Sequence, residues 1–399
     1  MRKNYLQLLG GVLLSMMAVA GLTSCNHDLS DHFGVSDNPS EGGGSSTINA
    51  TAIKLSQTMK VIKLGGDALT ITATVTPSDA TFTWESSDEA VATVANGVVT
   101  PKGVGIATIT AKSGDVKATC EVFVGNEVAL SAAAYEAKNY DILKGDNGAN
   151  SITIPDGFKV AFDGVKTTEG IVCSGDATIY LIDGKTNTVS AAANKAGIQI
   201  GGTGTTLTIN AETTGDGTLN ATGGYRAAGI GTGNGYDSNV TGGDITINGG
   251  TVTAIGSDEA AGIGTGCSRE GSSSASNQCG DITINGGTVT ATGGNNAAGI
   301  GTGHSQKQSK TVNQTCGDIT IATGVTSVTA KFGSGSSVSI GMGNASGGGS
   351  QSCGKITFGT ETVATAGAYS IGTGNGTYTY GGLTLAISVP TWMLTPVAP

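Results

Sequence analysis

The chain has 399 residues, of which 13% are charged and 67 are glycine. The formal net charge of −10 argues against a nucleic-acid partner, because such a partner needs a basic surface. Charged residues are also too sparse for a catalytic cluster, since beyond residue 200 the sequence has six basic residues and the single histidine His304. We therefore expect a protein that is not an enzyme and has no catalytic residues.

Residues 1–24 are typical of a secretion signal. Arg2 and Lys3 precede an apolar run that reads as a signal peptide rather than a membrane span. The run ends in Leu-Thr-Ser-Cys at 22–25, which resembles the lipobox of bacterial lipoproteins. That resemblance implies cleavage before Cys25 and lipidation of its sulfur, and hence a lipid-anchored protein of the bacterial outer membrane, at the cell surface. The alternative is an ordinary secretion signal followed by a chance cysteine.

Residues 51–125 predict a separate β-sandwich, preceded by a flexible Gly- and Ser-rich tether at 25–50. Short alternating stretches recur at the spacing of about seven strands. The alternation along one of them places Trp84 in the core rather than on a sugar-binding surface. The chain resembles the bacterial immunoglobulin-like domain of group 2 in Trp84-Glu85-Ser86-Ser87-Asp88, Val91-Ala92-Thr93-Val94 and Gly105-Ile106-Ala107-Thr108-Ile109. The resemblance implies a spacer or adhesive module.

One segment then recurs four times at intervals of 37 residues. Its copies are GGDITIN at 242–248, CGDITIN at 279–285, CGDITIA at 316–322 and CGKITFG at 353–359. Each copy opens a unit of short strands divided by glycine turns, and each unit buries too few aliphatic side chains to be stable alone. A period of this length predicts supersecondary units that stack on one another.

The stacked units predict a right-handed parallel β-helix over residues 126–388, so the expected fold class is all-β. About 23 residues of each repeat suit one coil of three strands, and the rest leaves the coil as an excursion at one corner. Residues 126–210 predict irregular N-terminal coils, and 389–399 a C-terminal tail. Stacking places aliphatic residues in interior columns: Ile245, Ile282, Ile319 and Ile356; Ile247, Ile284, Ile321 and Phe358; and Ile230, Ile263, Ile300, Ile340 and Ile371.

The order of elements over about 150–385 resembles a family of bacterial surface β-helix proteins that bind carbohydrate. The resemblance is carried by Leu181, Asp183-Gly184, Asn187-Thr188, the run at 215–219, and the AAGIG and GDITINGGTVTATG motifs. It implies binding of plant cell-wall polysaccharide, assisted by calcium. The chain departs from that family in its glycine-rich GIGTG strand, where binding members often carry charged or larger residues.

Six cysteines follow Cys25, an even number that fits disulfide bonding in an exported chain. Three of them share one repeat position, and neighbouring rungs about 4.8 Å apart are within reach of a disulfide. We expect Cys316 to pair with Cys353, and Cys267 with Cys279; the competing pairing is Cys279 with Cys316. No metal site is expected at these sulfurs, because no CxxC pair or partner histidine accompanies them. The two cysteines expected to be buried as apolar residues are Cys120 and Cys173.

Asp244, Asp281 and Asp318 also recur at one repeat position, just before a strand. A column of carboxylates could bind calcium through oxygen ligands. The alternative, favoured by Lys355 at the next position, is that Gly-Asp is turn chemistry at a strand entrance. No cofactor is therefore required, and calcium is the one candidate.

These features predict a lipid-anchored, non-enzymatic surface protein whose β-helix binds polysaccharide. The alternative is a structural or adhesive stalk that contacts host or neighbouring-cell proteins. The expected partners are a membrane, through the lipid anchor, and a polysaccharide or surface-protein ligand. Aromatic rings in register would favour the glycan, since sugar faces stack on them, but the candidates Tyr225, Tyr236, Tyr378 and Tyr380 are few and not periodic.

Overall fold

The computed structural model describes residues 48–334, 338–359, 361–364, 376–380 and 383–388. The predicted signal peptide, the lipidation site Cys25, nearly all of the tether, Ile371 and the C-terminal tail lie outside these ranges. Within them every regular element is a β-strand, which confirms the all-β class. No helix in the described part of the chain is long and apolar enough to cross a membrane.

The N-terminal sandwich has a four-stranded sheet in the order β5-β8-β9-β2, a three-stranded sheet β3-β7-β6 and the pair β1-β4. Its strands are β1 (Ala52–Leu55), β2 (Met59–Lys63), β3 (Leu69–Thr70), β4 (Ala73–Thr76), β5 (Thr83–Ser86), β6 (Ala92–Ala95), β7 (Val98–Pro101), β8 (Gly105–Ser113) and β9 (Val116–Ala129). As predicted, Trp84 packs against the core, where it meets Phe82 edge to face at 5.9 Å between ring centroids. The prediction missed β2, whose alternation is broken by two adjacent buried residues, Val61 and Ile62.

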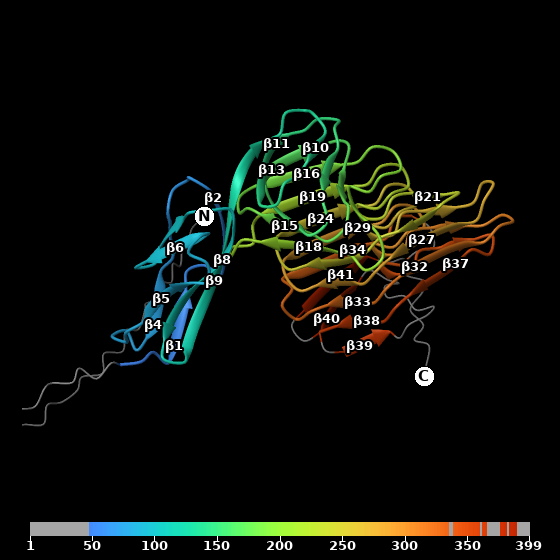
Figure 1. The fold of residues 1–399 in the computed structure, drawn as a ribbon. Coiled ribbons are helices and arrows are strands. Elements are labelled where there is room, and N and C mark those ends of the chain that lie inside the picture. The colour runs from blue at the N-terminus through green and yellow to red at the C-terminus, as the bar shows by residue number, and fades with distance from the viewer. Residues whose placement is uncertain (1–47, 335–337, 360, 365–375, 381–382, 389–399) are drawn as a thin grey trace, which may run out of the picture. The chain divides into compact units, whose positions relative to one another are not determined.

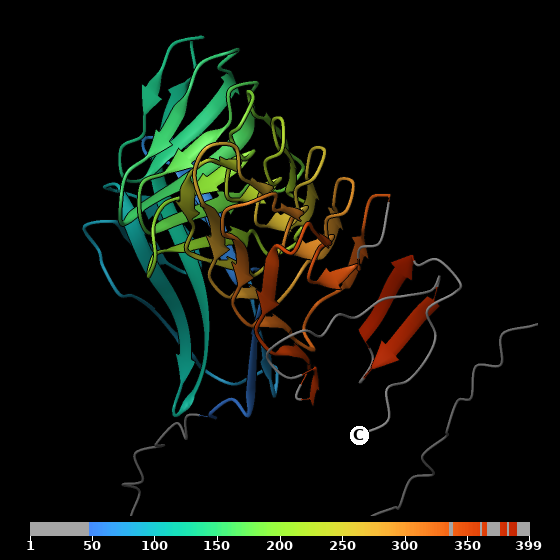
Figure 2. The same ribbon diagram turned by 90° about the vertical axis from the view of Figure 1, so that its right-hand side faces the viewer.

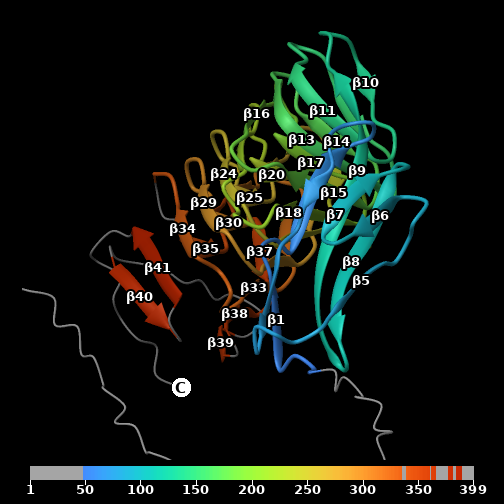
Figure 3. The same cartoon turned by 90° about the vertical axis from the view of Figure 1, so that its left-hand side faces the viewer.

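Strand β9 continues from the sandwich into the β-helix without a break. It pairs with β8 along the hairpin seen in Figure 3, and its last residues pair in parallel with β11 (Asp141–Asp146). The boundary expected between residues 125 and 126 therefore falls inside a strand. The buried ring of Phe123 lies 5.7 Å from the ring of Tyr140 and 5.1 Å from that of Tyr180, so aromatic packing also joins the two parts.

The first coils of the β-helix are irregular, because their strands differ in length and carry no excursion strands. They comprise β10 (Tyr135–Glu136), β11, β12 (Ile152–Ile154), β13 (Phe158–Thr167), β14 (Ile171–Cys173), β15 (Ala177–Leu181), β16 (Thr186–Ser190) and β17 (Ile198–Ile200). Their pairings are parallel, so each coil stacks directly on the next.

The repeats build three walls of parallel strands (Figures 1 and 2). The first wall holds β18 (Thr206–Ala211), β23 (Asp244–Ile247), β28 (Ile282–Ile284), β33 (Ile319–Ile321) and β38 (Ile356–Phe358). The second continues from β16 with β19 (Thr218–Thr222), β24 (Thr251–Ile255), β29 (Thr288–Thr292) and β34 (Ser327–Lys331). The third continues from β17 with β20 (Ile230–Gly231), β25 (Ile263–Gly264), β30 (Ile300–Gly301) and β35 (Ile340–Gly341).

The strand register confirms the 37-residue repeat. Ile245 lies opposite Ile282, Ile282 opposite Ile319, and Ile319 opposite Ile356 on successive rungs. These side chains, and those of the second and third predicted columns within the described residues, are buried in one continuous core. The parallel pattern changes at its C-terminal end, where β39 (Glu361–Ala364) runs antiparallel to β38, and β40 (Gly376–Tyr380) forms a hairpin with β41 (Leu383–Ser388).

The excursions are ordered as two further parallel sheets, visible at the right of Figure 1. One sheet holds β21 (Gly235–Tyr236), β26 (Ser268–Arg269), β31 (Ser305–Gln306) and β36 (Ala345–Ser346), and the other β22 (Asn239–Thr241), β27 (Ala275–Cys279), β32 (Val312–Cys316) and β37 (Ser350–Cys353). Their interior is largely polar. Buried Asn277 accepts from the Thr232 hydroxyl at 2.5 Å, and Gln314 and Gln351 repeat this contact with Thr265 and Thr302. An apolar period could not reveal such strands.

Candidate functional site

The first and second walls meet at a Gly-Gly corner, and a groove of about 500 Å³ crosses the rungs there. We call it the corner groove. It spans four rungs, and its lining consists of Thr58 from the sandwich and, from the β-helix, Ala211, Glu212, Thr213, Thr214, Gly215, Asn248, Gly249, Gly250, Asn285, Gly286, Gly287, Thr288, Gly324 and Thr326.

A ladder of asparagine amides runs along one side of the groove. Asn248 donates from Nδ2 to Oδ1 of Asn210 at 2.8 Å, and Asn285 donates in the same way to Asn248 at 2.9 Å. Asn248 thus uses one donor and one acceptor in the ladder and Asn285 uses one donor, whereas an amide has two donors and two lone pairs. Since Asn248 and Asn285 are exposed, their remaining capacity faces solvent. The sequence carries the signal for this ladder, the Asn that closes each TIN motif, but that motif alone does not indicate a function.

The floor of the groove is bare because the rungs approach closely there. A Cβ on Gly286 would meet the carbonyl oxygen of Asn248 at 2.4 Å, and one on Gly287 would meet that of Gly250 at the same distance. Gly250 and Gly287 also have φ near +80°, a region that disfavours other residues. The glycines are thus required by the stacking, and an open floor of backbone follows from it.

Glu212 and Thr213 close one end of the groove and hold the sandwich in contact with the β-helix. The Glu212 carboxylate is fully buried and accepts from Lys60 Nζ at 2.6 Å, the Val61 amide at 2.7 Å and the Asp183 amide at 3.1 Å. Thr213 accepts from the amides of Thr58 and Met59. The one carboxylate that lines the groove is therefore already paired.

The aspartates predicted as a possible calcium ladder do stack. One oxygen of Asp244 accepts the amide of Asp281 at 2.8 Å, Asp281 accepts that of Asp318 at 2.7 Å, and Asp318 accepts that of Lys355 at 2.7 Å. Each carboxylate thus ties its rung to the next. One oxygen of each aspartate therefore accepts a backbone amide. Lys355 Nζ also lies 3.4 Å from the second oxygen of Asp318.

The same hydrogen bond between a carboxylate and the amide of the next rung occurs earlier in the chain, where the sequence shows no regular repeat. Asp156 accepts the amide of Asp176 at 2.8 Å, and Asp176 accepts that of Thr206 at 2.7 Å. Thr206, which lies opposite Asp244, separates these two carboxylates from the ladder of the regular repeats.

The described cysteines are all buried thiols, and Cys120 and Cys173 lie in the two cores as predicted. Cys279, Cys316 and Cys353 are direct partners on successive rungs, and the thiols on either side of Cys316 raise its pKa. Both the preferred and the competing pairing of Cys316 stay predictions. The proposed Cys267–Cys279 pair also stays a prediction, and in this structure the Cys267 thiol lies elsewhere, 3.5 Å from Glu259.

Glu259 gathers a cluster that the sequence did not bring together. His304 Nδ1 lies 3.0 Å from Oε1 of Glu259, while Arg226 Nε and Arg269 Nη1 lie 3.0 and 3.6 Å from Oε2. The hydrogen bond from His304 and the charges of the two arginines lower the pKa of Glu259 to about 2. Glu259, Cys267 and His304 offer a donor set for a transition metal. The two guanidinium groups already neutralise the carboxylate, which fits a structural ion-pair network better.

Acidic side chains also join neighbouring excursions. The carboxylate of Asp237 accepts the amides of Gly271, Ser272 and Ser273, which lower its pKa to about 2. Glu270 holds the amides of residues 308–310 on the next rung in the same way. These carboxylates are therefore occupied by backbone donors.

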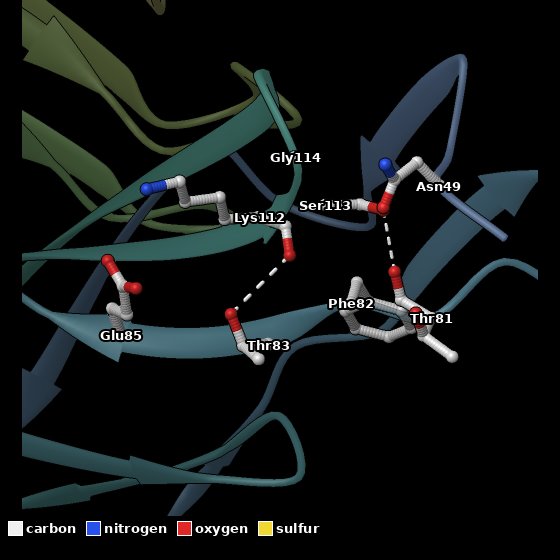
Figure 4. Close-up of a pocket in the computed structure, with 8 residues that line it drawn as sticks. All are labelled: Asn49, Thr81, Phe82, Thr83, Glu85, Lys112, Ser113 and Gly114. Atoms are coloured by element: carbon white, nitrogen blue, oxygen red, sulfur yellow. Dashed lines mark hydrogen bonds between the residues drawn. The ribbon is translucent and has the colours of Figure 1, made fainter. Parts of the chain in front are cut away.

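A second hollow, of about 390 Å³, lies on the sandwich (Figure 4). Phe82, Glu85 and Lys112 line it, together with Ser113. Ser113 is engaged structurally, because its hydroxyl donates to the Thr81 carbonyl at 2.6 Å and accepts from the Ala50 amide at 2.8 Å. The lining residues contain no nucleophile and base in hydrogen-bond contact.

Exposed aromatic rings are sparse near the groove. Tyr225 and Tyr236 are 50% and 52% exposed, but neither lines the groove, and the Arg226 guanidinium covers one face of Tyr225 at 4.8 Å. The side chains of Tyr378 and Tyr380 lie outside the described residues.

Comparison with known proteins matches two parts of the chain. Residues 49–122 match the bacterial Ig-like domain of group 2, and residues 214–234, 245–267 and 282–304 match a β-helix repeat. A protein named alpha-L-arabinofuranosidase, from Bifidobacterium longum, is 46% identical over 94 residues. That similarity covers 21% of this chain and 9% of the relative, so the chain spans only a small part of it. The chain therefore joins a bacterial Ig-like domain of group 2 to a region of β-helix repeats, a combination that indicates a surface or carbohydrate-related protein.

Proposed function

We propose that the protein is a non-enzymatic, lipid-anchored protein of the bacterial cell surface that binds glycans through its β-helix. The observation that carries the proposal is the corner groove, where exposed amides and threonine hydroxyls line an open backbone floor. Hydroxyl-rich ligands are recognised by such a mixture of donors and acceptors. The similarity of one segment to a protein named alpha-L-arabinofuranosidase supports a role that involves carbohydrate.

The proposal that the protein is not an enzyme rests on the contacts of its titratable groups. In the described part of the chain Glu212, Glu259, Asp237 and Glu270 are each bound to cations or backbone amides. The corner groove has no second carboxylate, and glycoside hydrolysis needs a pair of them. Incubation with polysaccharides should therefore release no reducing ends, and any turnover would contradict this part of the proposal.

The binding test is a pull-down of residues 26–399 on insoluble and immobilised polysaccharides, with and without calcium. Retention on a polysaccharide supports the proposal, and retention only with calcium would assign the ion a role at the aspartate ladder. Failure to bind any glycan would overturn it and leave the adhesive stalk. A specific observation favours that alternative: no aromatic ring lines the groove, so it offers no stacking platform.

The anchor is tested separately. A Cys25→Ala variant should lose the acyl mass on its N-terminal peptide and leave the membrane fraction, whereas an ordinary secretion signal would make the variant behave like the parent. Surface exposure is then tested by protease digestion of whole cells, which should remove the protein only if it faces outward.

A further inference from the structure

The corner groove carries no net charge of its own. Its lining consists of glycines, threonines, one alanine, two asparagines and Glu212, whose carboxylate is already paired with Lys60. None of its lining residues is a lysine, an arginine or an aromatic residue. An anionic sugar would therefore lose its hydration without gaining a countercharge.

Two aspartates lie at one end of the groove. The Thr214 hydroxyl at one end bonds to Asp216 at 3.0 Å and also to Asp183. The whole chain carries a formal charge of −10. Both features oppose the approach of a polyanion.

The spacing of the groove also constrains its ligand. The lining residues come from four successive rungs, so the groove extends over three rung steps of about 4.8 Å, about 14 Å in all. Its direction is across the strands, since Asn210, Asn248 and Asn285 follow one another from rung to rung. Two rungs of the groove thus present an amide, from Asn248 and Asn285, to a chain laid along the solenoid axis, and the groove has room for roughly three sugar rings at this spacing.

We propose that the corner groove takes a neutral, extended polysaccharide segment along the solenoid axis, held by the asparagine ladder and without calcium. The inference rests on the proposed glycan-binding function and narrows it to sugars without carboxylate or sulfate groups. Binding relies on hydrogen bonds alone, so the affinity of one groove is modest and depends on repeated contacts along the ligand.

The chain itself supplies a conservative substitution for the test. Ala322 follows Asn285 in the same column on the next rung, because its neighbours Ile321 and Ile284 are direct partners. The fold therefore accepts alanine at this position. The matched control is Asn220→Ala, since Asn220 lies on the outer side of the second wall in register with Thr253 and does not line the groove.

The experiment uses residues 26–399 and measures retention by affinity electrophoresis in gels that contain either a neutral polymer (xylan, β-glucan, mannan or arabinan) or polygalacturonate. We expect retardation by a neutral polymer that persists in a chelator. The Asn248→Ala/Asn285→Ala variant should bind about tenfold more weakly, which corresponds to about 1.4 kcal/mol for two lost amide contacts. Asn220→Ala should bind like the parent.

Each contrary result is distinct. Retardation by polygalacturonate alone, or only with calcium, would overturn the neutral-ligand inference and leave the proposed glycan binding intact. Neutral binding that the double variant retains would place the site outside the corner groove. No retardation by any polymer would overturn both this inference and the proposed function.

Discussion

Lys60 of the Ig-like domain reaches Glu212 of the β-helix, with its Nζ 2.6 Å from a carboxylate whose side chain is fully buried. Two backbone amides, of Val61 and Asp183, donate to the same carboxylate. The pair thus joins two parts of the chain that lie 152 residues apart in sequence. Glu212 also lines one end of the corner groove.

Glu212→Gln should destabilise the protein by about 2 kcal/mol. The change leaves Lys60 without its countercharge, but 31% of the Lys60 side chain is exposed and solvent reduces the loss. The measurement is the free energy of unfolding in urea. The matched control is Glu127→Gln, because Glu127 pairs with Lys63 at 3.2 Å in an exposed setting, where such a pair contributes about 0–1 kcal/mol. Equal losses in the two variants would refute a special role for Glu212.

Gln314→Leu should cost about 2 kcal/mol, because the excursion loses the side-chain amide that bonds to two of its buried carbonyls. The Gln314 amide donates to the carbonyl of His304 at 2.6 Å and to that of Gly266 at 3.1 Å. Proteolysis within residues 305–316 should also become faster, since the excursion would open locally. Gln278→Leu on the exposed side of the preceding excursion is the control, and it should change neither quantity.

Low pH should destabilise the excursions, because it protonates the carboxylate of Asp237. Its pKa is lowered from 3.8 to about 2 by three backbone amides, so the ionised form is the one that the folded state favours. The contribution is therefore complete above pH 3.8 and is lost as the pH falls towards about 2. The difference in melting temperature between the parent and Asp237→Asn should be constant above pH 4 and should shrink below it. A difference that does not change with pH would contradict this account.

The repeat itself was predictable because its signal is periodic and apolar. Isoleucines at 245, 282, 319 and 356 fixed both the period and the register, and the structure confirms them as direct partners. The Ig-like domain was predictable in the same way, from strands that alternate around Trp84. In both cases one buried face dictates where each side chain points.

The polar parts of the molecule could not be derived in this way. Asn277 and Gln314 are as buried as the isoleucines and follow the same 37-residue interval, but they are polar, so an apolar pattern does not mark them as interior. The contact between Glu259 and His304 joins residues 45 positions apart, on neighbouring rungs. The corner groove is formed by residues of four stacked rungs together with Thr58 from the Ig-like domain. These residues come together only in the folded chain.

The cysteine column should contain no more than one disulfide. Cys316 is the direct partner of both Cys279 and Cys353, and one sulfur can form only one such bond. Peptide mapping without reduction, on protein isolated from an oxidising compartment, should find Cys316 linked to one neighbour, and the other neighbour either alkylated or linked to Cys267. In a Cys316→Ser variant Cys279 and Cys353 should not be linked to each other. A Cys279–Cys353 link in the parent would contradict the observed register.

Gly287→Ala should lose stability for two reasons, a positive φ angle and overpacking between rungs, and comparison with Gly204→Ala should separate them. At Gly287 φ is +79° and a Cβ would lie 2.4 Å from the Gly250 carbonyl oxygen, whereas at Gly204 φ is +77° and nothing lies within 4 Å. Gly204→Ala should therefore cost only about 1 kcal/mol, from backbone conformation. Gly287→Ala should cost about 2 kcal/mol more, from overpacking between rungs. Urea unfolding measures both values, and equal losses would show that the rungs can move apart at the groove floor. Such movement would also remove the steric reason for the bare floor, on which the fit of an extended glycan depends.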